Sequence, residues 1–156
     1  MNAANHRSPT ADREIVLSRL YDAPRALVFE AWTTPEHVAQ WFGPNGFTNT
    51  IHEMDVRPGG AWRFIMHGPD GVDYPNEIIF HEVVKPERLV YSHGPAPVFH
   101  VTVLFEDEHG KTRLRMRSLF PTAAEKDRVV DEFGAIEGGK QTMERLAAFL
   151  ANEEIP

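Results

Sequence analysis

The chain contains no cysteine among its 156 residues. Disulfide bonds and thiolate chemistry are therefore excluded, and a chain without disulfides suits a reducing compartment. No apolar run approaches the roughly 20 residues that a membrane-spanning helix needs. The first residues, from Met1 to Asp12, are polar and lack the apolar core of a secretory signal. We therefore expect a soluble, cytoplasmic protein with no membrane partner.

Basic residues are in deficit, because 16 Lys and Arg stand against 23 Asp and Glu, which gives a net charge of −7. An acidic domain repels phosphate backbones. The one basic row comprises Lys111, Arg113, Arg115 and Arg117, which alternate along a predicted strand and share one face. Such rows usually face water, and the acids at 106–108 lie across the next turn. We predict a solvated strand face and no nucleic-acid partner.

The composition is that of a globular domain, with 42% apolar and 25% charged residues. The chain shows no internal repeat and no linker, and its length fits one domain. We expect a flexible N-terminal segment over residues 1–12, a single domain over residues 13–152, and a tail over residues 153–156. A monomer and a homodimer are both compatible with this organisation.

The apolar pattern predicts an α+β fold. A strand over Glu14–Tyr21 precedes two short helices, one ending near Thr33 and the other running from Thr34 to Trp41. The period then changes to two, and the short, turn-rich connections force neighbouring strands to be antiparallel. The strands predicted from this period are Phe47–Arg57, Ala61–His67, Val72–Val84, Leu89–His93, Val98–Glu106 and Thr112–Leu119.

A long helix is predicted from about Ala123 to Asn152, and it covers the apolar face of the sheet. Its apolar stripe consists of Val129, Phe133, Ile136, Met143, Ala147 and Leu150. Gly134, Gly138 and Gly139 lie within this helix, and each costs roughly 1 kcal/mol relative to alanine. They need a reason, such as close contact between helix and sheet, a kink, or room for a ligand.

Short motifs in a specific order carry a family resemblance. They are Asp22-Ala23-Pro24, Ala31-Trp32-Thr33, Trp41-Phe42-Gly43-Pro44, Asp55-Val56-Arg57-Pro58-Gly59-Gly60, Pro69-Asp70-Gly71 and Pro86-Glu87-Arg88-Leu89-Val90-Tyr91. From Arg13 to Ala151 the chain resembles the activator of heat-shock protein 90 ATPase homologue family, within the START and birch-pollen-allergen-like (SRPBCC) superfamily.

The resemblance implies a helix-grip fold, in which a curved antiparallel sheet of six to seven strands wraps around the long C-terminal helix and leaves a cavity. Superfamily members commonly bind lipids, sterols, polyketides or other apolar molecules there, and some catalyse cyclisation or dehydration. The eponymous eukaryotic member is a two-domain cochaperone whose other domain has no counterpart in this sequence. The family often has Gly-Trp in the last helix, where this chain has Gly138-Gly139 and so lacks a bulky plug.

We predict that the cavity binds a small hydrophobic or aromatic molecule, without a metal or organic cofactor. Gly139 leaves room in it, and His81, Tyr91 and His93 are the polar groups best able to orient a ligand. The competing interpretation is a filled core, because apolar stripes usually pack. The apolar residues expected to line the cavity are Trp62, Phe64, Met66, Val101, Val103, Phe105, Leu114, Met116, Phe133 and Met143.

Two carboxylates are candidates for acid–base chemistry. Glu53 and Asp55 face the cavity if Pro58-Gly59 forms a two-residue hairpin turn, and burial would then raise their pKa values. A different turn or a bulge places both in water, which is the favoured alternative. The loop itself joins two strands, so it predicts a hairpin rather than a phosphate-binding site.

Metal binding is disfavoured by the spacing of the histidines. None of the eight forms an i, i+4 pair, and no HExxH motif occurs. His81, His93 and His100 lie on neighbouring predicted strands, but an isolated strand histidine is seldom a ligand. Two other functions stay open beside ligand binding. One is a chaperone-associated or stress-response interaction module, and the other is a cyclase or dehydratase that uses the same cavity.

Overall fold

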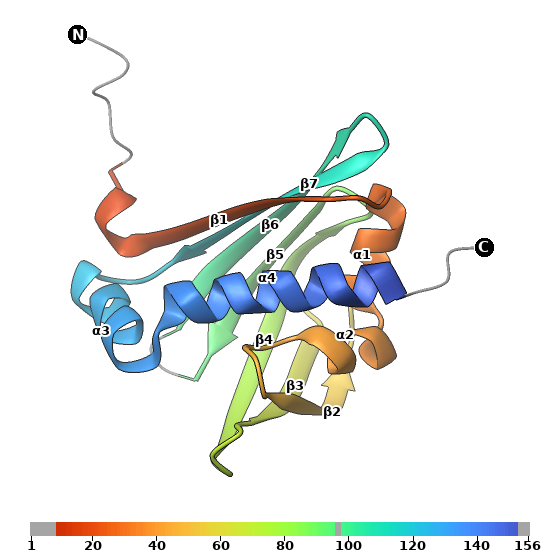
Figure 1. Cartoon of the computed structure of the whole chain (residues 1–156). Helices are drawn as coiled ribbons and strands as arrows, with labels where there is room; N and C mark the ends of the chain where they lie inside the picture. Colours follow the sequence, from red (N-terminus) through yellow and green to blue (C-terminus); the bar gives the residue numbers. More distant parts are fainter. Residues whose placement is uncertain (1–8, 96–97, 153–156) are drawn as a thin grey trace, which may run out of the picture.

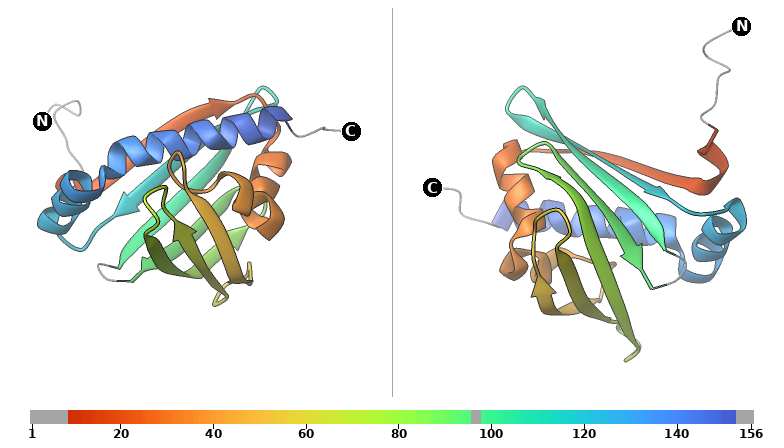
Figure 2. Two further views of the ribbon diagram at one scale, coloured as in Figure 1. Left: turned by 60° about the horizontal axis from the view of Figure 1, so that its bottom comes forward. Right: turned by 180° about the vertical axis from the view of Figure 1, so that it is seen from behind.

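A computed structural model describes residues 9–95 and 98–152. A seven-stranded antiparallel sheet curves around a long helix close to the C-terminus (Figures 1 and 2). The strand order is β1-β7-β6-β5-β4-β3-β2, so β2 to β7 form a meander and β1 pairs with the last strand of it. The predicted α+β helix-grip fold is confirmed. Residues 1–8 of the segment 1–12 predicted to be flexible, and the predicted tail 153–156, lie outside the described residues.

The strands begin and end within a few residues of the predicted positions, except that β2 is shorter. After Met54 the chain turns, with the N–H of Asp55 donating to the carbonyl oxygen of Ala61 at 2.8 Å. The strands are β1 (Glu14–Tyr21), β2 (Thr48–Met54), β3 (Ala61–His67), β4 (Asp73–Val84), β5 (Arg88–Gly94), β6 (Phe99–Glu108) and β7 (Lys111–Leu119).

The helices are η2 (Ala11–Arg13, a 3-10 turn), α1 (Arg25–Thr33), α2 (Pro35–Trp41), α3 (Ala123–Phe133) and α4 (Ala135–Asn152). The prediction of one continuous helix after Ala123 is wrong. Gly134 adopts the left-handed conformation, with φ 58°, and its N–H donates to the carbonyls of Val129 and Val130. This is a helix C-terminus that glycine forms without steric cost. Only α4 then lies across the concave face, while α3 turns aside toward η2 and β1 (Figure 1).

The break at Gly134 also shifts the apolar stripe. Phe133 and Ile136 were expected to face the sheet, but they are 62% and 38% exposed. Phe133 ends α3, before the break at Gly134, so it does not share a face with Met143 of α4. Ile136 lies in the first turn of α4, next to this corner, and is exposed there. The buried residues of α4 are Met143, Leu146 and Phe149.

The two faces of the sheet differ in kind. On the outer face, Arg113, Arg115 and Arg117 pair with Glu108, Glu106 and Glu14 at 3.0, 2.5 and 2.6 Å, which confirms the solvated, ion-paired strand face. The buried residues of the inner face include Trp62, Phe64, Ile78, Phe80, Leu89, Tyr91, Val101, Val103, Phe105 and Leu114.

No helix within residues 9–95 and 98–152 is long and apolar enough to cross a membrane.

Candidate functional site

One end of the concave face is closed by aromatic rings from α1 and α2. The ring centroids of Trp32 and Trp41 are 5.0 Å apart, and Phe42 lies 6.0 Å from Trp32 and 5.5 Å from Trp41. Phe42 also contacts Trp62 of the sheet at 5.1 Å. All four contacts are edge-to-face, which is a favourable geometry for aromatic pairs. This end of the concave face, called the packed end below, is filled by these rings, and Trp32, Trp41 and Phe42 also form one wall of the cavity next to it.

Beyond this cluster a cavity of about 170 Å³ lies between α4 and the strands β1, β5, β6 and β7. It is close in size to an engineered protein cavity of about 150 Å³ that stays dry and binds benzene. Most of its lining is apolar. The lining residues are Ile15, Leu17, Tyr21, Trp32, Trp41, Phe42, Tyr91, His93, Phe99, Met116, Ser118, Phe120, Ala135, Gly139, Thr142, Met143 and Leu146.

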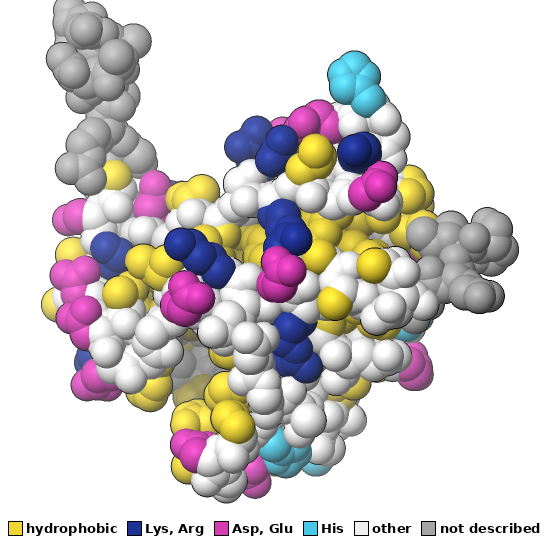
Figure 3. Space-filling model, in the orientation of Figure 1, with side chains coloured by type: hydrophobic (Ala, Val, Ile, Leu, Met, Phe, Trp, Pro, Cys, Tyr) yellow, Lys and Arg dark blue, Asp and Glu magenta, His cyan; other side chains and the backbone are white. Residues whose placement is uncertain are grey.

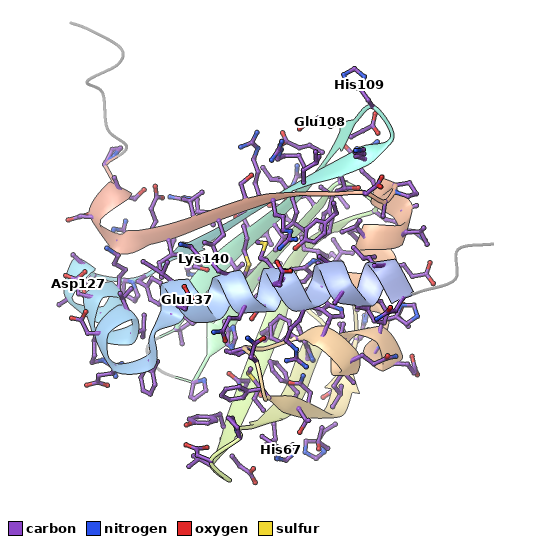
Figure 4. The ribbon with its side chains drawn as sticks, in the orientation of Figure 1. His67, Glu108, His109, Asp127, Glu137 and Lys140 are labelled. Atoms are coloured by element: carbon purple, nitrogen blue, oxygen red, sulfur yellow. The ribbon has the colours of Figure 1, made fainter. Side chains whose placement is uncertain are left out.

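The cavity exists because α4 presents small side chains to this part of the sheet. Ala135, Gly139 and Thr142 line it, whereas Glu137 and Lys140 of the same turns are exposed (Figure 4). A Cβ atom at Gly139 would lie 2.5 Å from Cδ1 of Leu17. A larger residue here therefore requires the end of the Leu17 side chain to move, and the same position borders the open volume.

Tyr91 is the most unusual polar group of the cavity. Its side chain is fully buried, and its hydroxyl has no hydrogen-bond partner among the residues that the structure describes. Burial raises the pKa of Tyr91 well above its ordinary value, so the hydroxyl keeps its proton. Tyr21 lines the same cavity and is different, because its hydroxyl donates to the carbonyl oxygen of Met143 at 2.9 Å.

A second donor of the cavity also lacks a partner. The indole nitrogen Nε1 of Trp32 is buried and bonds to none of the described residues, whereas that of Trp41 donates to the carbonyl oxygen of Ala31 at 3.0 Å. Nε1 of Trp62 is likewise buried without a described partner, but Trp62 belongs to the packed end and does not line the cavity. A buried donor without a partner costs about 1–3 kcal/mol.

His93 is held in place from the far side of the ring. Its Nε2 lies 2.8 Å from Oδ1 of Asn76, whose Nδ2 donates to the carbonyl oxygen of Tyr74 at 2.8 Å. Since that bond turns the amide oxygen toward the ring, Nε2 of His93 carries the hydrogen. The ring stacks on Phe99 with centroids 4.8 Å apart. Burial lowers the pKa of His93 to about 4, so the imidazole is neutral at neutral pH.

The electrostatic character of the cavity follows from its composition. No lining residue in the described part of the chain is Asp, Glu, Lys or Arg. The polar groups are hydroxyls, one neutral imidazole and indole nitrogens. An ion inside would therefore lose its hydration without gaining a partner of opposite charge, which is costly. The cavity suits neutral molecules.

The structure separates the predicted ligand-binding residues into three groups. Tyr91, His93, Met116, Gly139 and Met143 line the cavity. Met66 and Phe133 border a different, wider groove below the α3–α4 corner (Figure 3). The residues that are buried in the core without lining the cavity are Trp62, Phe64, Val101, Val103, Phe105 and Leu114.

The prediction that His81 orients a ligand is wrong, since His81 is exposed on the outer face of the sheet. A register shift between Phe80 and Glu82 reverses the alternation at this point. Nε2 of His81 lies 2.5 Å from Oγ of Ser92, which in turn lies 3.0 Å from Nδ1 of His100. No three or more His, Asp or Glu residues within 9–95 and 98–152 are placed to hold a metal ion.

Glu53 and Asp55 lie in solvent, as the favoured alternative predicted. A register shift between Ile51 and Glu53 turns Glu53 outward, where it pairs with Arg63. Arg63 also bonds Glu77 at 2.7 Å. Asp55 pairs with Arg57 at 2.7 Å. Neither carboxylate contributes to the cavity.

The strongest contribution that sequence reasoning missed comes from β1. Ile15 and Leu17 lie on the strand predicted over Glu14–Tyr21, but they were not predicted to belong to a site. They reach the cavity because β1 pairs with β7, with Leu17 opposite Met116 and Ile15 opposite Ser118. A pairing across about a hundred residues leaves no local signal in the sequence.

Solved structures similar to this chain share the fold. A protein from Arthrobacter aurescens superposes with a TM-score of 0.85 at 24% identity, covering 94% of this chain and 91% of its own. Protein NE0264 from Nitrosomonas europaea has a TM-score of 0.80 at 26% identity, with 90% and 96% coverage. The AHSA1 protein SPO3351 from Silicibacter pomeroyi has a TM-score of 0.76 at 21% identity, with 90% and 99% coverage.

A family model described as "Activator of Hsp90 ATPase homolog 1-like protein" matches residues 22–151. None of the curated proteins matches the chain.

Proposed function

Since the chain belongs to the Activator of Hsp90 ATPase homolog 1-like family, whose fold suggests ligand binding, we propose that its cavity binds a small apolar molecule. The observation that carries this proposal is the volume of about 170 Å³ left between α4 and the sheet, in a core that is otherwise packed. Ligand sites of this kind are mostly apolar and contain a few convergent polar groups. Tyr91 and His93 are such groups here.

The energetics favour an occupant. An empty cavity in a protein core costs about 24 cal/mol per Å³, so a cavity of this size costs at most about 4 kcal/mol. Water fills an apolar cavity poorly, because each molecule needs two to four polar partners. An apolar ligand restores the missing dispersion contacts and removes its own surface from water.

Binding is favoured over catalysis by the protonation states of Tyr91 and His93, two of the titratable groups of the cavity. A general acid or base works best when its pKa lies near the working pH. Burial moves the pKa of Tyr91 upward and that of His93 down to about 4, so that both stay neutral around neutral pH. With Glu53 and Asp55 in solvent, a cyclase-type reaction has no carboxylate in the cavity. The chaperone contact, the stress-response role and the cytoplasmic location stay predictions.

The experiment is ligand-observed NMR with toluene. Wild-type protein should bind toluene, and Ala135→Leu should weaken binding about tenfold or more, because the larger side chain fills the cavity. The matched control is Ala148→Leu, the same substitution on the exposed side of α4. It should leave toluene binding unchanged. An absence of binding to the wild-type protein, or an equal loss in both variants, would contradict the proposal.

A further inference from the structure

We infer that the ligand is a small neutral molecule that presents a hydrogen-bond acceptor, such as the carbonyl oxygen of a ketone or an ester, to the hydroxyl of Tyr91. This inference rests on the proposed function and adds the chemical class of the ligand. It is carried by the unpartnered donors of the cavity, by its lack of charge and by its size.

The first step is the direction of the missing hydrogen bonds. Tyr91 and Trp32 line the cavity, and Tyr91 Oη and Trp32 Nε1 are buried without a partner in the described structure, although both carry a hydrogen to donate. The hydroxyls of Tyr21 and Thr142 are already committed, to the carbonyl oxygens of Met143 at 2.9 Å and Gly138 at 2.9 Å. The cavity therefore has donors to spare, and an acceptor on the ligand satisfies them.

The second step excludes ions. A carboxylate would find donors but no cationic partner, because the imidazole of His93 is neutral and none of the described lining residues is Lys or Arg. A protonated amine would find no carboxylate. In a low-dielectric site such an unpaired ion is strongly disfavoured. Free fatty acids and amines are thereby excluded as a class.

The third step sets the size. A volume of about 170 Å³ accommodates a single aromatic ring with a short substituent, since a cavity of about 150 Å³ binds benzene. Sterols and long-chain lipids, which the family resemblance implied as a class, are too large for the cavity in this conformation. A monocyclic aryl ketone or ester satisfies the volume, the neutrality and the acceptor requirement together.

The test compares three probes of similar shape by NMR titration: acetophenone, its hydrocarbon analogue α-methylstyrene, and benzoate. Wild-type protein should bind acetophenone about tenfold more tightly than α-methylstyrene, and benzoate should not bind at neutral pH. Tyr91→Phe should remove this preference by weakening acetophenone about tenfold, while α-methylstyrene binds as before. Tyr74→Phe is the matched control, because Tyr74 loses the same atom without lining the cavity, and it should change neither affinity.

The outcomes separate the two claims. Binding of neither neutral probe to the wild-type protein contradicts the proposed function itself. Equal affinity for acetophenone and α-methylstyrene, a preference that survives in Tyr91→Phe, or tighter binding of benzoate overturns the inference and leaves apolar binding intact. Thermal unfolding of each variant shows that it folds, which is expected because Tyr91→Phe removes a buried hydroxyl that makes no bond to the described residues.

Discussion

The two ends of the concave face present similar apolar strand residues but meet very different helices. At the packed end, α1 and α2 supply Trp32, Trp41 and Phe42, whose rings fill the space above the sheet. At the other end, α4 supplies Ala135 and Gly139 among its lining residues, and a cavity remains. The size of the helix side chains, rather than a lack of apolar residues on the sheet, thus decides where this protein has room for a ligand.

The largest expected effect comes from removing one phenyl ring at each end. Phe105 is 1% exposed, and the centroid of its ring lies 5.2 Å from that of Phe29. Phe105→Ala should therefore lower the free energy of unfolding by about 3–5 kcal/mol. Phe120 is equally buried at 3% exposed, but it borders the cavity. Phe120→Ala should cost clearly less, about 2 kcal/mol, because that side of the ring already lacks partner atoms.

Urea-induced unfolding of the two variants measures the difference. Equal losses of stability would show that the cavity end is packed as tightly as the other end in solution, and the comparison would then fail. A saturating cavity ligand should raise the free energy of unfolding of the wild type and of Phe120→Ala, because it binds only the folded protein.

An intermediate effect is expected from pH, because His93 lies at the cavity end. Its pKa is about 4 in the folded protein, below the ordinary value of about 6.5. Between these pH values the unfolded chain binds more protons, so acid favours unfolding. The contribution of His93 to the free energy of unfolding is present above about pH 6.5 and is lost as the pH falls toward 4. The loss is about 1–2 kcal/mol when the partial exposure of His93 is allowed for.

The measurement is the free energy of unfolding near pH 7 and near pH 4.5 for wild type, His93→Gln and His52→Gln. His93→Gln should show a smaller loss of stability on acidification, whereas His52→Gln, an exposed strand position, should behave as wild type. Glu14 and Glu108, whose pKa values are lowered by hydrogen bonds from Arg117 and Arg113, lose their contributions equally in all three proteins. Identical pH profiles for all three would place His93 in water.

The smallest effect concerns the corner that carries α4 onto the sheet. Gly134→Ala forces a side chain into the left-handed conformation and should cost about 1 kcal/mol. Gly138→Ala is the control, because it lies within a helix, where alanine gains up to about 1 kcal/mol in propensity. Its Cβ would approach Cγ of Pro44 to 3.3 Å, which offsets that gain. In thermal unfolding, the midpoint temperature of Gly134→Ala should be lower than that of Gly138→Ala. The reverse order would argue against the break between α3 and α4.

Much of the fold could be predicted from local patterns. The alternation of apolar residues identified every strand and placed Val101, Val103 and Phe105 on the buried face. The family resemblance came instead from the short motifs and their order along the chain. The alternation failed at the register shift in β4 and at Gly134, where one residue changes the direction of everything after it. His81 lies at that shift and Phe133 lies directly before Gly134, and both were misplaced.

The sequence by itself determined the order of the elements, the inward and outward sides of most strands, and the absence of thiol chemistry, because these depend on residue type and on spacings of a few positions. Only the tertiary structure decided which buried residues border the cavity. Tyr91 and Val101 are both fully buried on neighbouring strands, yet only Tyr91 meets open volume. That difference depends on the pairing of β1 with β7 and on the small residues that α4 brings over from the far end of the chain. Packing between segments so distant in sequence is set by their mutual fit, which no local pattern encodes.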